Sequence, residues 1–314
     1  MARSSRAAPA APVAWRDGIH LTGTPIWCDA RRRRDVCFVS SVDRIGALGH
    51  GQLIATQITL GLVGASPDAG HLAVPLRKPF TLGTLRLELL ASGRCAGAAA
   101  LHVDARGRTA LYAGPLRTAD APLGESPADV RACDALAIAA PFGAPHHRFE
   151  PLADVAERVI AWVRAERAAK KIPSLAVDTP LDGVEVAARL IDAGFHVAAG
   201  KSVRDVAARL PGAPKLAGPS READAIVRTE RDRAKPGSPT ALVSGRALDP
   251  HPYALGFAWP FVAGRAELLA WIEQTRAKDV FVTGACAEDI ASALGPRARV
   301  LGPPRQMTLF EAAP

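Results

Sequence analysis

The stretch that decides the fold class runs from residue 152 to residue 198 and reads LADVAERVIAWVRAERAAKKIPSLAVDTPLDGVEVAARLIDAGFHVA. Its first part carries apolar side chains at Val155, Val159, Ile160 and Val163, a spacing that places them on one face of a helix. In order, the stretch predicts a helix over residues 152–169, a strand over 175–177, a helix over 184–193 and a strand over 195–198. Strands that alternate with helices are typical of a parallel sheet, so we predict an α/β protein.

The segments on either side differ in pattern. Before residue 145, short strand-like runs are separated by glycine-containing turns, and Arg106-Gly107-Arg108 predicts a hairpin turn. These runs are residues 18–21, 36–40, 53–55, 84–90, 98–104 and 109–113. After a helix at 203–210 comes a loop-like stretch, 211–239, with one short strand at 225–227. The last part predicts strands at 241–244, 280–283 and 298–301 and helices at 265–276 and 287–294.

The composition limits the class of protein. The chain has 314 residues, of which 48% are hydrophobic and 22% charged, as in an ordinary globular protein. A formal net charge of +8 favours a polyanionic partner, although an arginine-rich coding bias explains the excess equally well. The five cysteines form no C-x-x-C pair. With no signal-peptide core and no membrane-length apolar run, we expect a cytoplasmic protein with no membrane contact.

Framing segments give the chain a family resemblance. These are Asp35–Ser40 (DVCFVS), Leu82–Leu89 (LGTLRLEL) followed by Ser92-Gly93, Leu111–Gly114 (LYAG), Asp134–Ile138 (DALAI) followed by Pro141–Gly143, Ala241–Gly245 (ALVSG) and Asp279–Thr283 (DVFVT). From Trp15 to Leu301 the chain resembles the metallo-β-lactamase fold. Within that fold it is most similar to the bacterial ligase-associated DNA exonucleases of the β-CASP branch.

The resemblance implies a metallo-β-lactamase-like αββα sandwich with an inserted β-CASP-like βα segment. It divides the chain into a disordered lead (1–12), a first core part (13–145), an insert (146–239), a closing core part (240–302) and a flexible tail (303–314). The tail begins at Pro303-Pro304, because consecutive prolines end a helix or a central strand.

The residues that would bind the family's two metal ions are missing. The resemblance places a His-x-His-x-Asp-His signature at 41–46, which reads SVDRIG. The other expected ligands are replaced by Arg94, Pro115, Trp259-Pro260-Phe261 and Gly284. Only Asp43 remains, and one carboxylate binds a metal weakly. We therefore expect no catalytic residue, no metal and no cofactor.

The histidines do not predict a rebuilt site. His146 and His147 are adjacent, and neighbouring side chains of an extended loop point apart. The remaining candidates, His50, His71, His102, His196 and His251, lack the spacing of metal ligands.

Basic residues near the expected groove are candidates for nucleic-acid binding. Arg31, Arg32, Arg33 and Arg34 form a run that could pair with phosphates. Arg94 and Arg117 follow the turns where the resemblance implies metal ligands, so a guanidinium there could bind a phosphate. The alternative is that the run is a solvated loop.

The C-terminal tail contains a second recognisable motif. Gln306, Met307, Thr308, Leu309 and Phe310 agree with all five positions of the pentapeptide by which bacterial polymerases and repair proteins dock on the DNA sliding clamp. Such a tail would lie extended in a groove of the partner. The alternative is that its apolar residues fold back on the protein.

Three functions remain open from the sequence. The first is a catalytically inactive, nuclease-like DNA-repair accessory protein that docks on the sliding clamp, contacts DNA and tethers other repair proteins. The second is a metal-dependent DNA or RNA exonuclease with a rearranged site. The third is a structural partner of an active nuclease of the same family.

Overall fold

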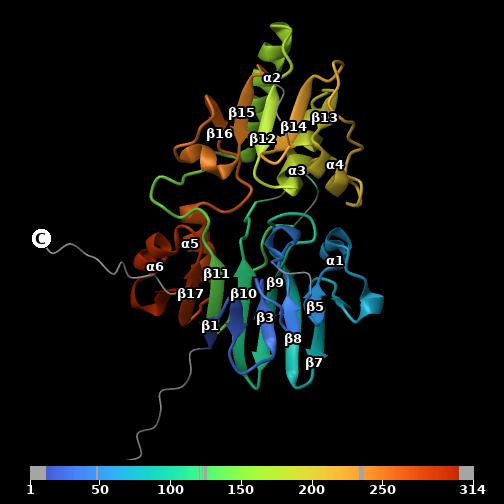
Figure 1. Cartoon of the computed structure of the whole chain (residues 1–314). Coiled ribbons are helices and arrows are strands. Elements are labelled where there is room, and N and C mark those ends of the chain that lie inside the picture. Colours follow the sequence, from blue (N-terminus) through green and yellow to red (C-terminus); the bar gives the residue numbers. More distant parts are fainter. Residues whose placement is uncertain are drawn as a thin grey trace, which may run out of the picture.

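A computed structural model describes residues 12–46, 49–119, 121, 123, 126–232 and 237–303. Two lobes lie one above the other in Figure 1. The lower, which we call the sandwich lobe, contains two sheets, and the upper, the parallel-sheet lobe, contains one. The chain is of the mixed α/β class. Across the described residues, no helix is both long and apolar enough to cross a membrane.

The first sheet of the sandwich lobe has six strands in sequence order. They are β1 (Val13–Trp15), β2 (Ile19–Leu21), β3 (Ile26–Cys28), β4 (Val36–Phe38), β5 (Gln52–Ala55) and β6 (Leu72–Ala73). The second sheet has the order β18-β17-β11-β10-β9-β8-β7. Its strands are β7 (Pro79–Leu82), β8 (Leu85–Ala91), β9 (Ala99–Ala105), β10 (Arg108–Gly114), β11 (Ala135–Ala139), β17 (Asp279–Thr283) and β18 (Ala298–Val300).

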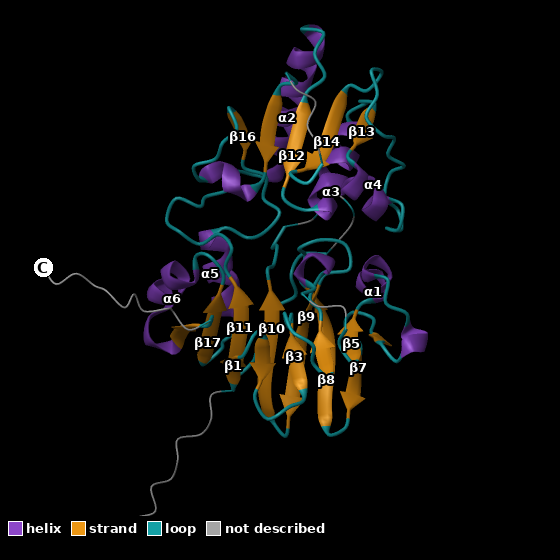
Figure 2. Cartoon of the chain, in the orientation of Figure 1, coloured by secondary structure: helices purple, strands orange, loops and turns teal. Residues whose placement is uncertain are grey.

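The two sheets pack face to face between helices. Alternate strand residues, such as Ile26 and Leu87, meet in a shared apolar core because successive side chains of a strand point to opposite faces. Leu60 of α1 (Gln57–Val63) packs on the outer face of the first sheet. Helices α5 (Arg265–Gln274) and α6 (Ala287–Leu294) cover the outer face of the second. Figure 2 shows these helices on the outside of the lobe.

The parallel-sheet lobe has five strands, all parallel, in the order β13-β14-β12-β15-β16. They are β12 (Ser174–Val177), β13 (Val197–Ala199), β14 (Ala225–Thr229), β15 (Thr240–Val243) and β16 (Leu255–Phe257). Helices α2 (Leu152–Ala168), α3 (Pro180–Asp192) and α4 (Lys201–Ala207) pack against them. The expected alternation of helix and strand over 152–198 is therefore confirmed, with α3 beginning one turn earlier than predicted.

The early start of α3 has a local cause. Thr179 accepts a hydrogen bond from the Asp182 backbone, and the Asp182 carboxylate accepts one from the Thr179 backbone at 3.2 Å. This capping box, with Pro180 in the first turn, begins the helix before its amphipathic part.

One predicted boundary is wrong. We assigned residues 240–302 to the closing part of the core, but β15 and β16 pair within the parallel sheet of the upper lobe. Only β17, β18 and the helices α5 and α6 return to the sandwich lobe. The short apolar run at 241–244 fits either sheet, because a fully buried strand has the same pattern in both.

The parallel strands of the two lobes point toward each other. In Figure 2 the arrowheads of β10, β11 and β17 face those of β12 and β15 across the junction. The loops that follow carboxyl ends of parallel strands are where ligand sites form in α/β proteins. The junction between the lobes is therefore the place to look for a site.

Candidate functional site

A cavity of about 510 Å³ lies at the junction of the lobes. Pro115, Pro141 and Gly284 line it from the ends of β10, β11 and β17. Asp178 and Ser244 line it from the ends of β12 and β15. Phe142, Phe261 and Val262 make much of its wall apolar. A mostly apolar cavity with a few polar groups is the usual form of a small-molecule site.

The positions that the resemblance assigns to metal ligands meet at this cavity. Asp43, Arg94, Pro115 and Gly284 all line it, although they come from four separate parts of the sequence, and so does Phe261. Proline, glycine and phenylalanine side chains offer no ligand atom, and an arginine cannot give up its proton to bind a metal. The side chains at these positions do not fit a dinuclear metal centre.

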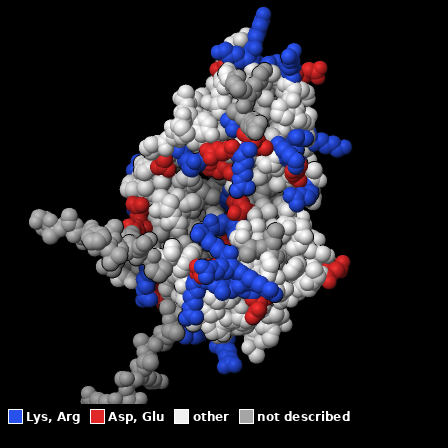
Figure 3. All heavy atoms as spheres, in the orientation of Figure 1, with Lys and Arg blue, Asp and Glu red and all other residues white. Residues whose placement is uncertain are grey.

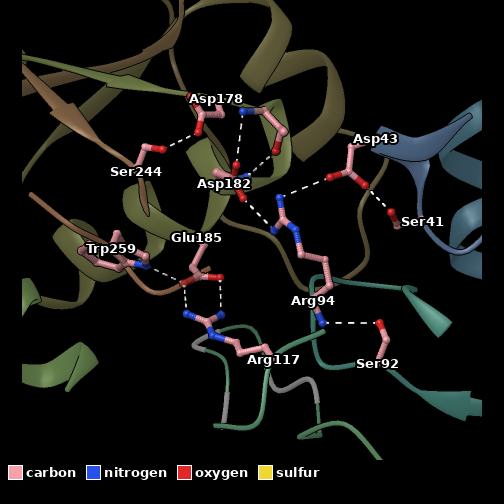
Figure 4. A network of polar contacts seen from close by, with 11 residues as sticks. Ser41, Asp43, Ser92, Arg94, Arg117, Asp178, Asp182, Glu185, Ser244 and Trp259 are labelled. Atoms are coloured by element: carbon pink, nitrogen blue, oxygen red, sulfur yellow. Dashed lines mark hydrogen bonds and ion pairs between the residues drawn. The ribbon is translucent and has the colours of Figure 1, made fainter. Parts of the chain in front are cut away.

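Arg94 bridges the two lobes beside the cavity, and Figure 4 shows its contacts. Its Nη1 donates to Asp182 Oδ1 of α3 at 2.8 Å, and its Nη2 lies 3.2 Å from Asp43 Oδ2 of the sandwich lobe. Burial disfavours its charge, but attraction to the two carboxylates outweighs burial and raises the Arg94 pKa well above its ordinary value. The Asp182 pKa is raised by burial, against the opposing effect of Arg94. Arg94 therefore stays a cation throughout the working pH range.

A second buried ion pair lies nearby, also in Figure 4. Arg117 donates through Nη1 and Nη2 to the two oxygens of Glu185, each at 2.9 Å. Glu185, on α3, also accepts a hydrogen bond at 2.7 Å from Nε1 of Trp259 in the parallel-sheet lobe. Both carboxylate oxygens are thus used, which a buried charge requires.

These pairs correct the predicted role of two arginines. Arg94 is 6% exposed and Arg117 2% exposed, and each guanidinium is bound to carboxylates. A phosphate could reach them only by breaking a buried ion pair. As the lobes stand, neither residue is available to a nucleic acid.

Asp29, a buried aspartate that the sequence did not single out, contacts Arg44 in the cavity wall. Asp29 accepts from the backbone and hydroxyl of Ser40 at 2.8 and 2.7 Å and from the Tyr112 hydroxyl at 2.6 Å. Burial raises the Asp29 pKa, while Arg44 and these hydrogen bonds oppose the rise. Arg44, whose Nε lies 3.5 Å from Asp29, lines the cavity. The signal in the sequence was a lone aspartate after a strand, which is too common to single out.

His146 and His147 do not point apart, contrary to expectation. A tight turn brings their ring centroids to 4.1 Å, and the Nε2 atoms lie 2.8 and 3.0 Å from Asp249 Oδ1. This geometry suits a metal ion. However, His147 Nδ1 accepts from the backbone N–H groups of Gly143 and Ala144 at 3.1 Å. A neutral ring held so carries its proton on Nε2, which therefore donates to Asp249 and has no lone pair for a metal.

The same two backbone amides also decide whether His147 can activate Cys286, whose Sγ lies 3.6 Å from His147 Nδ1. A thiol, an imidazole and a carboxylate in a row are the arrangement of a cysteine nucleophile with its base. Here a proton on Nδ1 would face two backbone N–H groups, so His147 is a poor base. We assign His146, His147 and Asp249 as a hydrogen-bonded clasp between the loop after β11 and the loop before β16.

The cavity offers no surplus of positive charge. Arg246 Nε donates to Asp178 Oδ1 at 2.8 Å and its Nη2 donates to Glu230 at 2.9 Å, while Ser244 donates to Asp178. With Arg94 and Arg246 paired and Asp249 also in the wall, a polyanion would find few free donors there.

The other predicted site residues lie away from the cavity or outside the described part of the chain. Arg31, Arg32 and Arg33 are exposed in the loop between β3 and β4, and Arg34 is half-buried. The clamp-binding residues 306–310 lie outside the described residues.

Comparison with known proteins shows a distant likeness to solved structures. No protein-family model matches the chain, and no curated protein matches it. A crystal structure of a protein of unknown function from Enterococcus faecalis V583 is similar, with a TM-score of 0.56 and 12% sequence identity. The similarity covers 85% of this chain and 79% of that chain. At this identity it shows a shared fold alone.

Proposed function

We propose that this chain is a catalytically inactive, nuclease-like DNA-repair accessory protein with a metallo-β-lactamase-like sandwich and a β-CASP-like second lobe. The observation that carries the proposal is the meeting of Asp43, Arg94, Pro115 and Gly284 at one cavity, with no set of metal-ligand side chains among them. The convergence at one cavity of residues that are far apart in the sequence supports the proposal.

In this proposal the Arg94 guanidinium supplies positive charge where the family has a metal ion, but it does not supply the chemistry of the metal. A metal ion in a hydrolase binds a water molecule, lowers its pKa and stabilises the charge that develops on a phosphodiester. A guanidinium has no open coordination position and releases no proton at working pH. The two carboxylates around Arg94 also use its donors. Arg94 therefore joins the two lobes and does not activate water as a metal ion would.

We propose that recruitment is the retained activity, through residues 306–310. Leu309 and Phe310 would be the apolar anchors, and Gln306 would hydrogen-bond at the mouth of the clamp's groove. Burying each anchor contributes on the order of 1.5–3 kcal/mol, which supports affinity of roughly micromolar strength. The support is the agreement of all five motif positions just after two consecutive prolines.

Binding to the cognate sliding clamp tests recruitment. We expect the full chain to bind at micromolar concentration by isothermal titration calorimetry, and the Leu309→Ala, Phe310→Ala variant to lose binding. Glu311→Ala, one residue beyond the motif, is the matched control and should bind as the wild type does. Equal binding by the wild type and the double variant, or no binding by either, would reject clamp docking.

A separate assay tests the absence of catalysis. Purified protein incubated with zinc or manganese should retain no stoichiometric metal after dialysis, and labelled DNA and RNA should remain intact. Stoichiometric metal with cleavage that Asp43→Asn abolishes would favour the exonuclease with a rearranged site.

A further inference from the structure

The loop between β3 and β4 displays a cluster of arginines on the outer side of the sandwich lobe. We call Arg16 and Arg31–Arg34 the arginine patch. Ile26 and Cys28 face the core between the sheets, so Trp27 faces outward, and the Arg34 guanidinium lies over the Trp27 ring. Figure 3 shows Lys and Arg side chains gathered on the front of this lobe up to the junction.

The backbone of this loop is held in place. Asp29 N–H donates to Phe38 O at 2.9 Å, and Arg31 N–H donates to Asp17 O at 3.0 Å. Arg34 N–H donates to Nδ1 of His50 at 3.1 Å. A loop fixed at its start, middle and end loses little backbone freedom when a ligand binds.

The charges of the patch are largely uncompensated. Arg32 Nε lies 3.5 Å from Asp17, but the two side chains are 75% and 50% exposed, so the pair is weak. Within the described part of the chain, no ion pair or hydrogen bond engages the side chain of Arg33. Asp17, Asp29 and Asp35 are the acidic residues within the same loops, against five arginines, and Asp29 is buried.

Aromatic rings lie among these arginines. The guanidinium of Arg34 stacks 3.8 Å from the ring centroid of Trp27, and that of Arg31 lies 5.9 Å from that of Trp15. His20 stacks against Trp27 at 4.4 Å. Arg34 is thus held against an aromatic ring, and the exposed arginines beside it are suited to phosphate contacts.

The segment from Asp43 to Gly46 runs between the patch and the cavity. An added Cβ at Gly46 would lie only 2.7 Å from the Cα of Arg31, so the segment after Asp43 and Arg44 packs directly on the patch. Asp43 and Arg44 line the cavity. A long polymer lying on the patch could therefore extend toward the junction of the lobes.

We propose that the arginine patch binds the phosphate backbone of a nucleic-acid strand. Guanidinium groups match phosphate oxygens with paired hydrogen bonds, and a run of them along one loop suits the repeated phosphates of a nucleic-acid strand. The patch goes beyond clamp docking, because none of its residues belongs to the tail. It also moves the expected nucleic-acid contact away from the cavity, where the arginines are already paired.

Fluorescence anisotropy with a labelled 20-nucleotide single strand and the matching duplex tests this surface in the full chain. The variant Arg31→Gln, Arg32→Gln, Arg33→Gln removes three exposed charges. The control Arg86→Gln, Arg106→Gln, Arg108→Gln removes the same charge from exposed arginines on β8 and at the β9–β10 turn. We expect the patch variant to bind at least about tenfold more weakly, and its plot of log affinity against log salt to be shallower by about 2.

The control variant should keep the affinity and salt dependence of the wild type to within about twofold. Equal loss in both variants would mean that net charge alone attracts the strand, and would overturn the proposal. Binding to phosphatidylserine vesicles with no binding to either oligonucleotide would also overturn it. The Leu309→Ala, Phe310→Ala variant should bind the oligonucleotides normally, so failure of clamp docking and failure of the patch can be told apart.

Discussion

At the scale of single residues, the buried charges have the greatest effect on stability. Arg94 and Asp182 face each other with side chains that are 8% and 2% exposed. A buried pair of this kind adds little net stability compared with apolar residues, but breaking it leaves a charge without a partner. The cost of a substitution therefore depends on what is left behind.

Arg94→Met should lower the free energy of unfolding by about 3–5 kcal/mol, because Asp182 and Asp43 lose their common partner. The double variant Arg94→Met, Asp182→Asn should lose less than the sum of the two single variants. Asparagine at 182 still accepts from the Thr179 backbone, so the helix cap remains. Urea unfolding of the four proteins measures the coupling, and strict additivity would contradict a buried pair.

The clasp at Asp249 predicts a pH dependence of stability. Burial favours the neutral carboxyl, but hydrogen bonds from His146 and His147 outweigh it and lower the Asp249 pKa. The folded state therefore binds this proton less tightly than the unfolded chain. The resulting stabilisation is present above the ordinary carboxyl range near pH 4 and is lost as the pH falls through the lowered pKa.

Wild type and Asp249→Asn should differ in melting temperature at pH 6 and converge toward pH 3. Differential scanning calorimetry at several pH values measures the difference. A constant difference across this range would show that Asp249 contributes no charge to the clasp.

At the scale of elements, the turn after β8 shows why a glycine is required. Gly93 has φ of +68°, and an added Cβ would lie 2.4 Å from the backbone oxygen of Arg117. Arg117 O also accepts from Ala128 N–H at 2.8 Å. The close approach of the two loops fixes the backbones that carry both buried arginines.

Gly93→Ala should destabilise the protein far more than Gly83→Ala. Gly83 also has positive φ, at +59°, but an added Cβ there meets nothing within 4 Å. Its substitution should cost about 1–2 kcal/mol, from backbone conformation alone. Chemical denaturation of the two variants gives the comparison, and similar costs would mean that the loops near residue 93 move apart easily.

The sequence predicts elements better than it predicts their partners. The α6 bounds agree with the predicted helix, since an amphipathic period is a local property. Helix α1 was not predicted, because its seven residues are too few to show a clear period. Strand β15 was predicted as a strand but placed in the wrong sheet, because pairing depends on residues far away in the sequence.

At the scale of the whole molecule, two buried ion pairs join the lobes. Arg94 and Arg117 belong to the sandwich lobe, and Asp182 and Glu185 to α3 of the parallel-sheet lobe (Figure 4). Because both ion pairs lie on α3, they limit the separation of the two lobes. This favours a fixed platform over a groove that opens and closes around a substrate.

Glu185→Gln should loosen this junction. Glutamine can still bond to Trp259, but the Arg117 guanidinium loses its counter-charge in a buried site. We expect faster amide hydrogen exchange in α3 and around residue 259, with β1–β6 unchanged. Unchanged exchange in α3 would show that the apolar contacts alone hold the lobes together.

The sequence by itself determined the α/β class and most of the elements of the upper lobe, since these follow from local pattern and residue type. Only the tertiary structure decided which charged side chains are buried and which partners they pair with. Arg94 and Asp182 are 88 residues apart in the sequence, and Arg117 and Glu185 are 68 apart. Pairing of this kind is decided by burial, because a charge removed from water must find its partner among whatever side chains the fold brings near it. The same rule separates the buried arginines of the junction from the exposed ones of the arginine patch, which the sequence alone had placed in one group.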